Sequence, residues 1–150
     1  MAREERCVLT NMVMVCDGTR ILVQDRLNPD WPGITFPGGH VEPCEPFADS
    51  AVREVREETG LEVRNLRLCG VQQWASEEGP RHVVICYRTS DFSGELKNSA
   101  EGRVFWIEPE ELETLRLSTD FAEMYRVFAD DALSENCFLG PEDDRTVLTR

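Results

Sequence analysis

Three glutamates, Glu54, Glu57 and Glu58, have the spacing of side chains that share one face of a helix. On a predicted helix over 47–59 they occupy positions i, i+3 and i+4. Carboxylates this close repel one another, and most such clusters are solvated acidic surfaces. Carboxylate oxygens are also the ligands that Mg²⁺ and Mn²⁺ prefer. The spacing alone leaves both interpretations open: an acidic surface or a site for a hard divalent cation.

The residues around this face favour the metal interpretation. Gly38 and Gly39 precede the helix; without side chains they let the backbone approach a ligand closely, so a carbonyl oxygen of either can complete a metal shell. Arg53 comes four residues before Glu57 and can orient its carboxylate, and Glu45 can hold Arg53 in turn. A metal site needs supporting contacts of this kind.

Strands are expected to position this segment. Runs of β-branched and apolar residues over 7–16 and 20–24 flank Asp17-Gly18, which predicts a hairpin. The helix over 47–59 ends before Gly60, a residue typical of the position after a helix. Its packed face is predicted to hold Ala48, Ala51, Val52 and Val55. Further strands are predicted over 35–36, over 61–74 (continuous or broken at Gly70), over 81–89 and over 103–107.

The C-terminal part is predicted to be less regular. Residues 90–100 have the composition of a polar loop, and 108–111 that of a helix start. A second long helix is expected over 118–133, and residues from 134 onward form an acidic, loosely packed tail. The side of this helix that faces the core is predicted to hold a stripe of Phe121, Met124, Tyr125 and Phe128.

The length of 150 residues suits a single domain over 1–150. Strands outnumber helices and alternate with them irregularly, which predicts the α+β class with a mixed sheet between helices. The net charge of -13 argues against binding a nucleic acid polymer. No apolar run is long enough to cross a membrane, and the charged start has no apolar segment of a secretory signal behind it, so a cytoplasmic location is expected.

The segment over 39–61 resembles the signature of the Nudix hydrolases, G-x5-E-x7-R-E-U-x-E-E-x-G-U, in which U is a bulky aliphatic residue. The similarity continues through FPGGHVE and SAEGRVFWI, which resemble the MutT-type branch. Cys44 departs from the glycine of many relatives, outside the fixed positions. Every fixed position is filled, by Gly39, Glu45, Arg53, Glu54, Val55, Glu57, Glu58, Gly60 and Leu61.

The resemblance implies an α/β/α sandwich with a central mixed β-sheet and a loop–helix–loop catalytic motif. It also implies Mg²⁺ as the cofactor, with Mn²⁺ as a substitute. Glu54, Glu57 and Glu58 would be metal ligands, and one of them or a neighbour would activate water. Arg53 and Glu45 would orient them. A carbonyl of Gly38 or Gly39 would be an additional ligand.

Residues outside the signature offer further candidates. Glu101, just before the 103–107 strand, is either an extra metal ligand or general base, or a polar loop residue. Arg26 either faces the phosphates or is simply exposed, and His40 either contacts the substrate or is a polar loop residue. Trp31 and Trp74 either stack on a base or pack in the protein.

The resemblance implies cleavage of a phosphoanhydride in a nucleoside diphosphate linked to another group. The leading expectation is hydrolysis of a (deoxy)nucleoside triphosphate, such as the oxidised purine 8-oxo-dGTP, to the monophosphate and pyrophosphate. Alternatives are ADP-ribose, a dinucleoside polyphosphate or a nucleotide sugar as substrate, and a non-catalytic nucleotide-binding regulatory domain. The expected partner is a small nucleotide, and the expected state is a monomer or homodimer.

Overall fold

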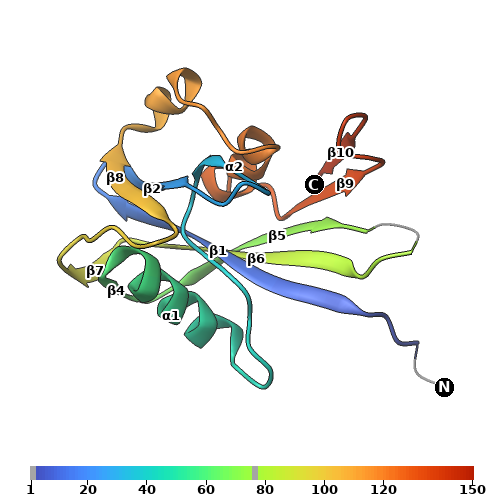
Figure 1. Cartoon of the computed structure of the whole chain (residues 1–150), viewed down its shortest axis with the longest axis horizontal. Coiled ribbons are helices and arrows are strands. Elements are labelled where there is room, and N and C mark those ends of the chain that lie inside the picture. Colours follow the sequence, from blue (N-terminus) through green and yellow to red (C-terminus); the bar gives the residue numbers. More distant parts are fainter. Residues whose placement is uncertain (1–2, 76–77) are drawn as a thin grey trace.

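The computed structural model describes residues 3–75 and 78–150. Strands dominate these residues (Figure 1), and two α-helices and one 3-10 helix within the described ranges interrupt them. In chain order the elements are β1 (Cys7–Asp17), β2 (Arg20–Arg26), β3 (Gly33–Thr35), α1 (Phe47–Thr59), β4 (Leu61–Arg64), β5 (Arg67–Trp74), β6 (Arg81–Thr89), β7 (Asp91–Gly94), β8 (Gly102–Ile107), η1 (Pro109–Thr114), α2 (Phe121–Ala129), β9 (Glu135–Leu139) and β10 (Thr146–Thr149).

The main sheet is mixed, as expected. Its strand order is β10-β9-β5-β6-β1-β2-β3, with β8 also paired to β2. The pairs β1–β6 and β5–β9 are parallel, and the other pairs in this sheet are antiparallel. β1 and β2 form the predicted hairpin, with Cys16 opposite Ile21. β4 and β7 form a separate antiparallel pair.

Alternate residues of β1 belong to two different cores. Met12 and Met14 pack in one core with Phe121 of α2. Val13 and Val15 pack in the other with Val55 of α1. The two helices therefore cover opposite faces of the sheet, as Figure 1 shows for α1 below the strands and α2 above them. The predicted α+β class and α/β/α sandwich are confirmed.

Helix α1 has the predicted bounds. It ends where Gly60 adopts a left-handed conformation (φ 77°) and donates its N–H to the Arg56 carbonyl at 2.9 Å. Ala51 and Val55 are fully buried, as predicted for the packed face. Ala48 is exposed instead, because the whole first turn over 47–49 stands clear of the sheet.

The glycine segment before α1 lies along β1. Val13 donates its N–H to the Pro37 carbonyl at 2.9 Å, Asn11 to the Gly39 carbonyl at 2.8 Å, and Val41 to the Leu9 carbonyl at 3.0 Å. A Cβ on Gly38 would lie 2.1 Å from the Asn11 carbonyl oxygen. Only glycine permits this approach, which fixes the segment between β1 and α1.

The prediction of a long second helix over 118–133 is wrong. Helix α2 spans Phe121–Ala129, because Asp120 before it is left-handed (φ 64°) and Asp130 after it is extended. The predicted core stripe is confirmed: Phe121, Met124 and Phe128 are buried, and Tyr125 is half-buried against the same core.

The predicted loose tail is also wrong, because β9 and β10 extend the main sheet. β9 pairs in parallel with β5, and β10 pairs with β9. Asn136 of β9 is fully buried and donates hydrogen bonds to Gln72 Oε1 of β5 (2.9 Å) and to the Glu123 carbonyl of α2 (2.7 Å). Sequence composition hid this strand, since a buried asparagine in an acidic stretch resembles a loop.

Other boundaries also differ from prediction, among them the short strand expected over 35–36, which is β3 (Gly33–Thr35). The 61–74 segment breaks at Asn65 (φ 52°) rather than at Gly70, where the β5–β6 register shifts instead. Part of the predicted 90–100 loop is β7, which pairs with β4. In the described part of the chain, no helix has the length and apolar character to span a membrane.

Candidate active site

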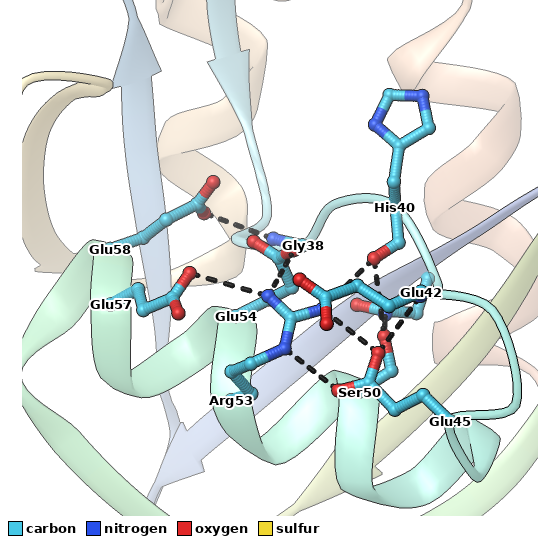
Figure 2. Close-up of polar contacts among 10 residues, drawn as sticks. Gly38, His40, Glu42, Glu45, Ser50, Arg53, Glu54, Glu57 and Glu58 are labelled. Carbon is cyan, nitrogen blue, oxygen red and sulfur yellow. Dashed lines mark hydrogen bonds and ion pairs between the residues drawn. The ribbon is translucent and has the colours of Figure 1, made fainter.

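Arg53 is the centre of the polar contacts on α1 (Figure 2). Its guanidinium donates two hydrogen bonds to Glu45, at 2.7 Å and 3.0 Å, and one to the His40 carbonyl at 3.0 Å. The same group reaches Glu54 at 2.9 Å and Glu57 at 3.3 Å. The predicted links from Arg53 to Glu45 and Glu57 are therefore present.

A second donor besides Arg53 fixes the Glu45 carboxylate. Its Oε2 also accepts the backbone N–H of Glu42 at 2.9 Å. The hydrogen bonds from Arg53, followed by that from Glu42, lower the pKa of Glu45 to about 2. Glu45 is consequently charged throughout the neutral range and raises the pKa of Arg53 in return.

Glu58 points toward the glycine segment and away from Arg53 (Figure 2). Its Oε2 accepts the backbone N–H of Gly38 at 3.0 Å, and the residue is only 5% exposed. Burial raises the pKa of Glu58 to about 7, with the negative charges of Glu54 and Glu101 adding to the effect. Burial also raises the pKa of Glu54.

Gly39 and Glu54 are in close contact. A Cβ built on Gly39 would lie 2.4–2.6 Å from the carboxylate atoms of Glu54. No side chain fits there, so the carboxylate lies directly against the backbone of the glycine segment. The Gly39 carbonyl already accepts the Asn11 N–H at 2.8 Å, and a carbonyl oxygen has a second lone pair for another contact.

A buried network fixes the glycine segment to α1. Asn11 donates from Nδ2 to Ser50 Oγ at 2.9 Å, and Ser50 donates to the His40 carbonyl at 3.4 Å. Asn11 is 3% exposed and Ser50 is fully buried. The sequence analysis missed both residues, since a single asparagine in a strand and a serine in a helix carry no signal of this pairing.

Glu101 lies beside the glutamate cluster, although it comes from the turn before β8. Its charge is close enough to Glu58 to raise the pKa of that carboxyl group. The Glu101 carbonyl accepts the Leu27 N–H at 3.0 Å, which ties this turn to the end of β2. The charge of Glu101 thus acts on Glu58, and the role of Glu101 as an extra ligand or general base stays a prediction.

A pocket of about 580 Å³ borders the glycine segment. Gly38 and Gly39 line it, so the pocket and the glutamate cluster share a wall. The pocket brings together residues that the sequence analysis had to treat separately. All four predicted substrate-binding residues line it: Arg26, Trp31, His40 and Trp74.

The two tryptophans of the pocket have structural partners. Trp31 donates from Nε1 to the Thr119 carbonyl at 2.9 Å, and the Arg26 guanidinium lies 5.8 Å from the centre of its ring. Trp74 stacks on His82 with the rings 5.0 Å apart and 3° from parallel. His82, which also lines the pocket, was missed because a lone histidine in a strand is usually a packing residue.

The described residues, 3–75 and 78–150, contain no ready-made group of three His, Cys, Asp or Glu side chains in metal-binding positions. Arg53 contacts two of the expected ligands, Glu54 and Glu57. The donor set nevertheless suits Mg²⁺ or Mn²⁺, because it consists of carboxylates and backbone carbonyls. Burial disfavours the negative charges of Glu54 and Glu58 and so raises their pKa values. A bound cation would offset this cost, because its positive charge stabilises both carboxylates.

Comparison with known proteins places this geometry in a family. The NUDIX domain model matches residues 8–130. The uncharacterized Nudix hydrolase YvcI of Bacillus subtilis is 29% identical over 116 residues, 73% of this chain and 71% of that protein. The 8-oxo-dGDP phosphatase NUDT18 of Danio rerio is 30% identical over 100 residues, 66% of this chain and 30% of that protein.

A solved structure shows the same fold. The MutT protein from Bacillus halodurans has a TM-score of 0.77 at 22% identity, and the match covers 95% of this chain and 97% of that one. The family match spans the glycine segment, the whole of α1 and Glu101. The chain therefore belongs to the Nudix hydrolase family.

Proposed function

We propose that this protein hydrolyses a phosphoanhydride bond in a nucleoside diphosphate linked to another group. The preferred substrate class is the (deoxy)nucleoside triphosphates, cleaved to the monophosphate and pyrophosphate, with oxidised purines such as 8-oxo-dGTP among them. The similarity to an 8-oxo-dGDP phosphatase supports the oxidised-purine part of this proposal.

One observation carries the proposal: the glycine segment touches both the glutamate cluster and the pocket. Gly39 lies against the Glu54 carboxylate, and Gly38 donates its N–H to Glu58. Both glycines also line the pocket that holds Trp31 and Trp74. A nucleotide with its base in this pocket would direct its phosphates past the glycines toward the glutamates.

The residues that would hold Mg²⁺ or Mn²⁺ are Glu54, Glu57, Glu58 and Glu101, with a carbonyl of Gly38 or Gly39. When bound, the metal supplies positive charge for the phosphates and lowers the pKa of water. The protein has a net charge of -13, so a polyanionic substrate needs such neutralisation.

Side chains of the protein position the carboxylates, accept a proton and bind the phosphates. Arg53 and Glu45 fix the carboxylates of Glu54 and Glu57 before substrate arrives, so little reorganisation is needed. A deprotonated glutamate of the cluster accepts the proton of the attacking water. Arg26 lines the pocket and contributes positive charge to the phosphates.

The test is a substrate panel assayed with Mg²⁺, with Mn²⁺ and with a chelator. The panel holds dGTP, 8-oxo-dGTP, dATP, ADP-ribose and diadenosine polyphosphates, with phosphate and pyrophosphate release measured. We expect metal-dependent pyrophosphate release from a triphosphate, reduced by orders of magnitude in Glu57→Gln with no change in fold. Activity confined to ADP-ribose or a dinucleotide would overturn the substrate class, and turnover that survives the chelator would overturn the metal assignment.

A further inference from the structure

Two glutamines of the main sheet are fully buried, but only one of them has hydrogen-bond partners for its side chain among the described residues. Gln72 of β5 donates from Nε2 to the Met124 carbonyl at 3.1 Å, and its Oε1 accepts Asn136 Nδ2 of the β9–β10 hairpin at 2.9 Å. Gln24 of β2 has no partner for either Oε1 or Nε2 in the part of the chain that the structure describes. Burial of an unpaired amide lowers stability. Packing alone therefore gives no reason for a glutamine at position 24.

Gln24 lies on the side of the sheet that α1 covers. Leu22, two residues earlier on β2, packs in one core with Val55 of α1. Side chains alternate along a strand, so Gln24 and Arg26 extend from the same side of β2 as Leu22. Val104 of β8, which is opposite Gln24, belongs to that core too. Gln24 is therefore at the boundary between the apolar core under α1 and the charged Arg26.

Glu58 lies at the same boundary, on α1. It follows Val55 by three residues, almost one helical turn, and so shares its side of the helix. Burial raises the pKa of Glu58 and the positive charge of Arg26 opposes that rise, so these two groups are neighbours. Along β2, Gln24 likewise lies between the core and Arg26. Gln24 and Glu58 are thus both placed next to Arg26, one on the sheet and the other on the helix.

Arg26, Gln24 and Glu58 have hydrogen-bonding groups that complement one another. Nε of Arg26 is buried without a partner in residues 3–75 and 78–150. Glu58 accepts the Gly38 N–H at 3.0 Å on Oε2 (Figure 2), and its Oε1 accepts no hydrogen bond from a described residue. A carboxamide offers an acceptor and donors, a guanidinium only donors and a carboxylate only acceptors. One glutamine can therefore bond to both neighbours at once.

We propose that Gln24 is a positioning residue that links Arg26 to Glu58 when a divalent cation and a phosphate group are bound. Its Oε1 then accepts from Arg26 Nε, and its Nε2 donates to Glu58 Oε1, through rotation of these side chains. Arg26 is thereby held beside the phosphates, and Glu58 in the orientation of a metal ligand. The inference rests on the proposed function, because that function makes Glu58 a metal ligand.

The energetics favour a neutral polar side chain in this role. Hydrogen bonds to charged groups are stronger than those between neutral groups, so two such bonds offset the cost of burying the amide. A contact that fixes the oxygens of a metal ligand also strengthens metal binding. An apolar residue makes neither bond, and a charged residue changes the balance between Arg26 and Glu58. Glutamine at position 24 thus lowers the stability of the free protein and raises its activity.

The two buried glutamines provide a matched pair of variants. Gln24→Met and Gln72→Met each replace a fully buried amide by an apolar side chain of similar length, and Gln24→Leu repeats the first change with another shape. For each protein, the urea midpoint is measured after chelator treatment. The Kd for Mn²⁺ is measured without nucleotide, from the electron paramagnetic resonance signal of the free ion. The kcat for dGTP is measured at saturating Mn²⁺.

Gln24→Met should leave the urea midpoint unchanged or raise it, because it removes two unpaired polar atoms. It should raise the Kd for Mn²⁺ about 10- to 100-fold and lower kcat by a similar factor. Gln24→Leu should match it. Gln72→Met should lower the urea midpoint, because the Met124 carbonyl loses a donor and the Asn136 amide loses an acceptor. It should retain the native Kd and kcat.

A lower urea midpoint in both Gln24 variants would overturn the inference, since it would show that the amide supports the fold. A native Kd for Mn²⁺ and a native kcat in both variants would also overturn it, while the proposed function would stand. If the native protein binds Mn²⁺ but hydrolyses no nucleotide of the panel, the proposed function fails. Weaker Mn²⁺ binding by Gln24→Met would support the inference even then, because Mn²⁺ binding is measured without nucleotide.

Discussion

The guanidinium of Arg53 binds both carboxylate oxygens of Glu45, at 2.7 Å and 3.0 Å. This two-point contact fixes the plane of the guanidinium, and its NH1 group then faces Glu54 and Glu57. Lysine cannot reproduce the contact, because an ammonium group is a point donor without a planar fork. The orientation of the cluster therefore depends on the arginine side chain and not only on its charge.

Arg53→Lys is expected to lower kcat by about 10- to 100-fold, as for other residues that support metal ligands. The melting temperature should change little by comparison. Arg56→Lys is the matched control, since Arg56 is three residues away on the same helix and its side chain forms an exposed pair with Glu62 at 3.5 Å. Steady-state kinetics and thermal melts of both variants test this. Equal losses of activity in the two would contradict the role of Arg53.

Gly39→Ala is expected to reduce activity about 100-fold by displacing the Glu54 carboxylate. The new methyl group would lie 2.4 Å from its carboxyl carbon. Gly18→Ala provides the opposite case. Its Cβ meets nothing within 4 Å, but φ is +61°, so we expect a stability loss of about 1–2 kcal/mol with normal turnover. Urea denaturation and kcat measured on both variants separate displacement of the Glu54 carboxylate from backbone strain. A Gly39→Ala enzyme with normal kcat would refute the close contact between Gly39 and Glu54.

The metal-free protein should become more stable as the pH falls from 8 toward 5. The pKa of Glu58 in the folded state is raised by burial from 4.5 to about 7. The folded state therefore binds a proton more tightly than the unfolded state, and protonation through pH 7 favours folding.

Glu58→Gln should remove the larger part of this dependence, leaving the part that comes from the raised pKa of Glu54. It should also raise the stability of the chelator-treated protein at pH 8, by up to about 3 kcal/mol. Glu57→Gln is the control, because the Glu57 side chain is 56% exposed. Denaturant unfolding across this pH range measures both. A pH profile that Glu58→Gln leaves unchanged would show that another group is responsible.

Asn136→Ala should lower the free energy of unfolding by about 2–3 kcal/mol. The change leaves Gln72 Oε1 and the Glu123 carbonyl without their donor. It also removes the acceptor of the Thr149 hydroxyl, now bound at 2.7 Å. Thr146→Ala, an exposed position of the same hairpin, should change stability by about 0.5 kcal/mol or less. Similar urea midpoints for the two variants would mean that the hairpin adds little to stability.

Local signals explain which parts of the fold were predictable. The end of α1 at Gly60 and the β1–β2 hairpin depend on a glycine or turn beside a periodic segment, and both were predicted correctly. Asn136 forms a strand only because Gln72, distant in sequence, supplies its buried partner. The left-handed Asp120 that shortens α2 likewise has no signal in the sequence around it.

The site divides in the same way. Spacing within one helix predicted that Arg53 reaches Glu57, and the structure contains that contact at 3.3 Å. Spacing along the sequence did not predict the contact of Asn11, which lies on β1 and donates to Ser50 of α1. Nor did it show that Trp31 and Trp74 line one pocket, because that depends on how β5 and the loop before β3 meet.

The glycine segment also has a consequence for solubility. β1 pairs with β6 along one side, but β2 pairs with it only near Cys16 and Asp17. Between Leu9 and Val13, the backbone of 37–41 takes the hydrogen bonds of the other side. An uncovered strand of this kind recruits strands from other molecules. Detachment of residues 37–41 would therefore expose an unpaired edge of β1 and also displace the glycines of the site. The same hydrogen bonds thus protect the protein against aggregation and preserve its activity.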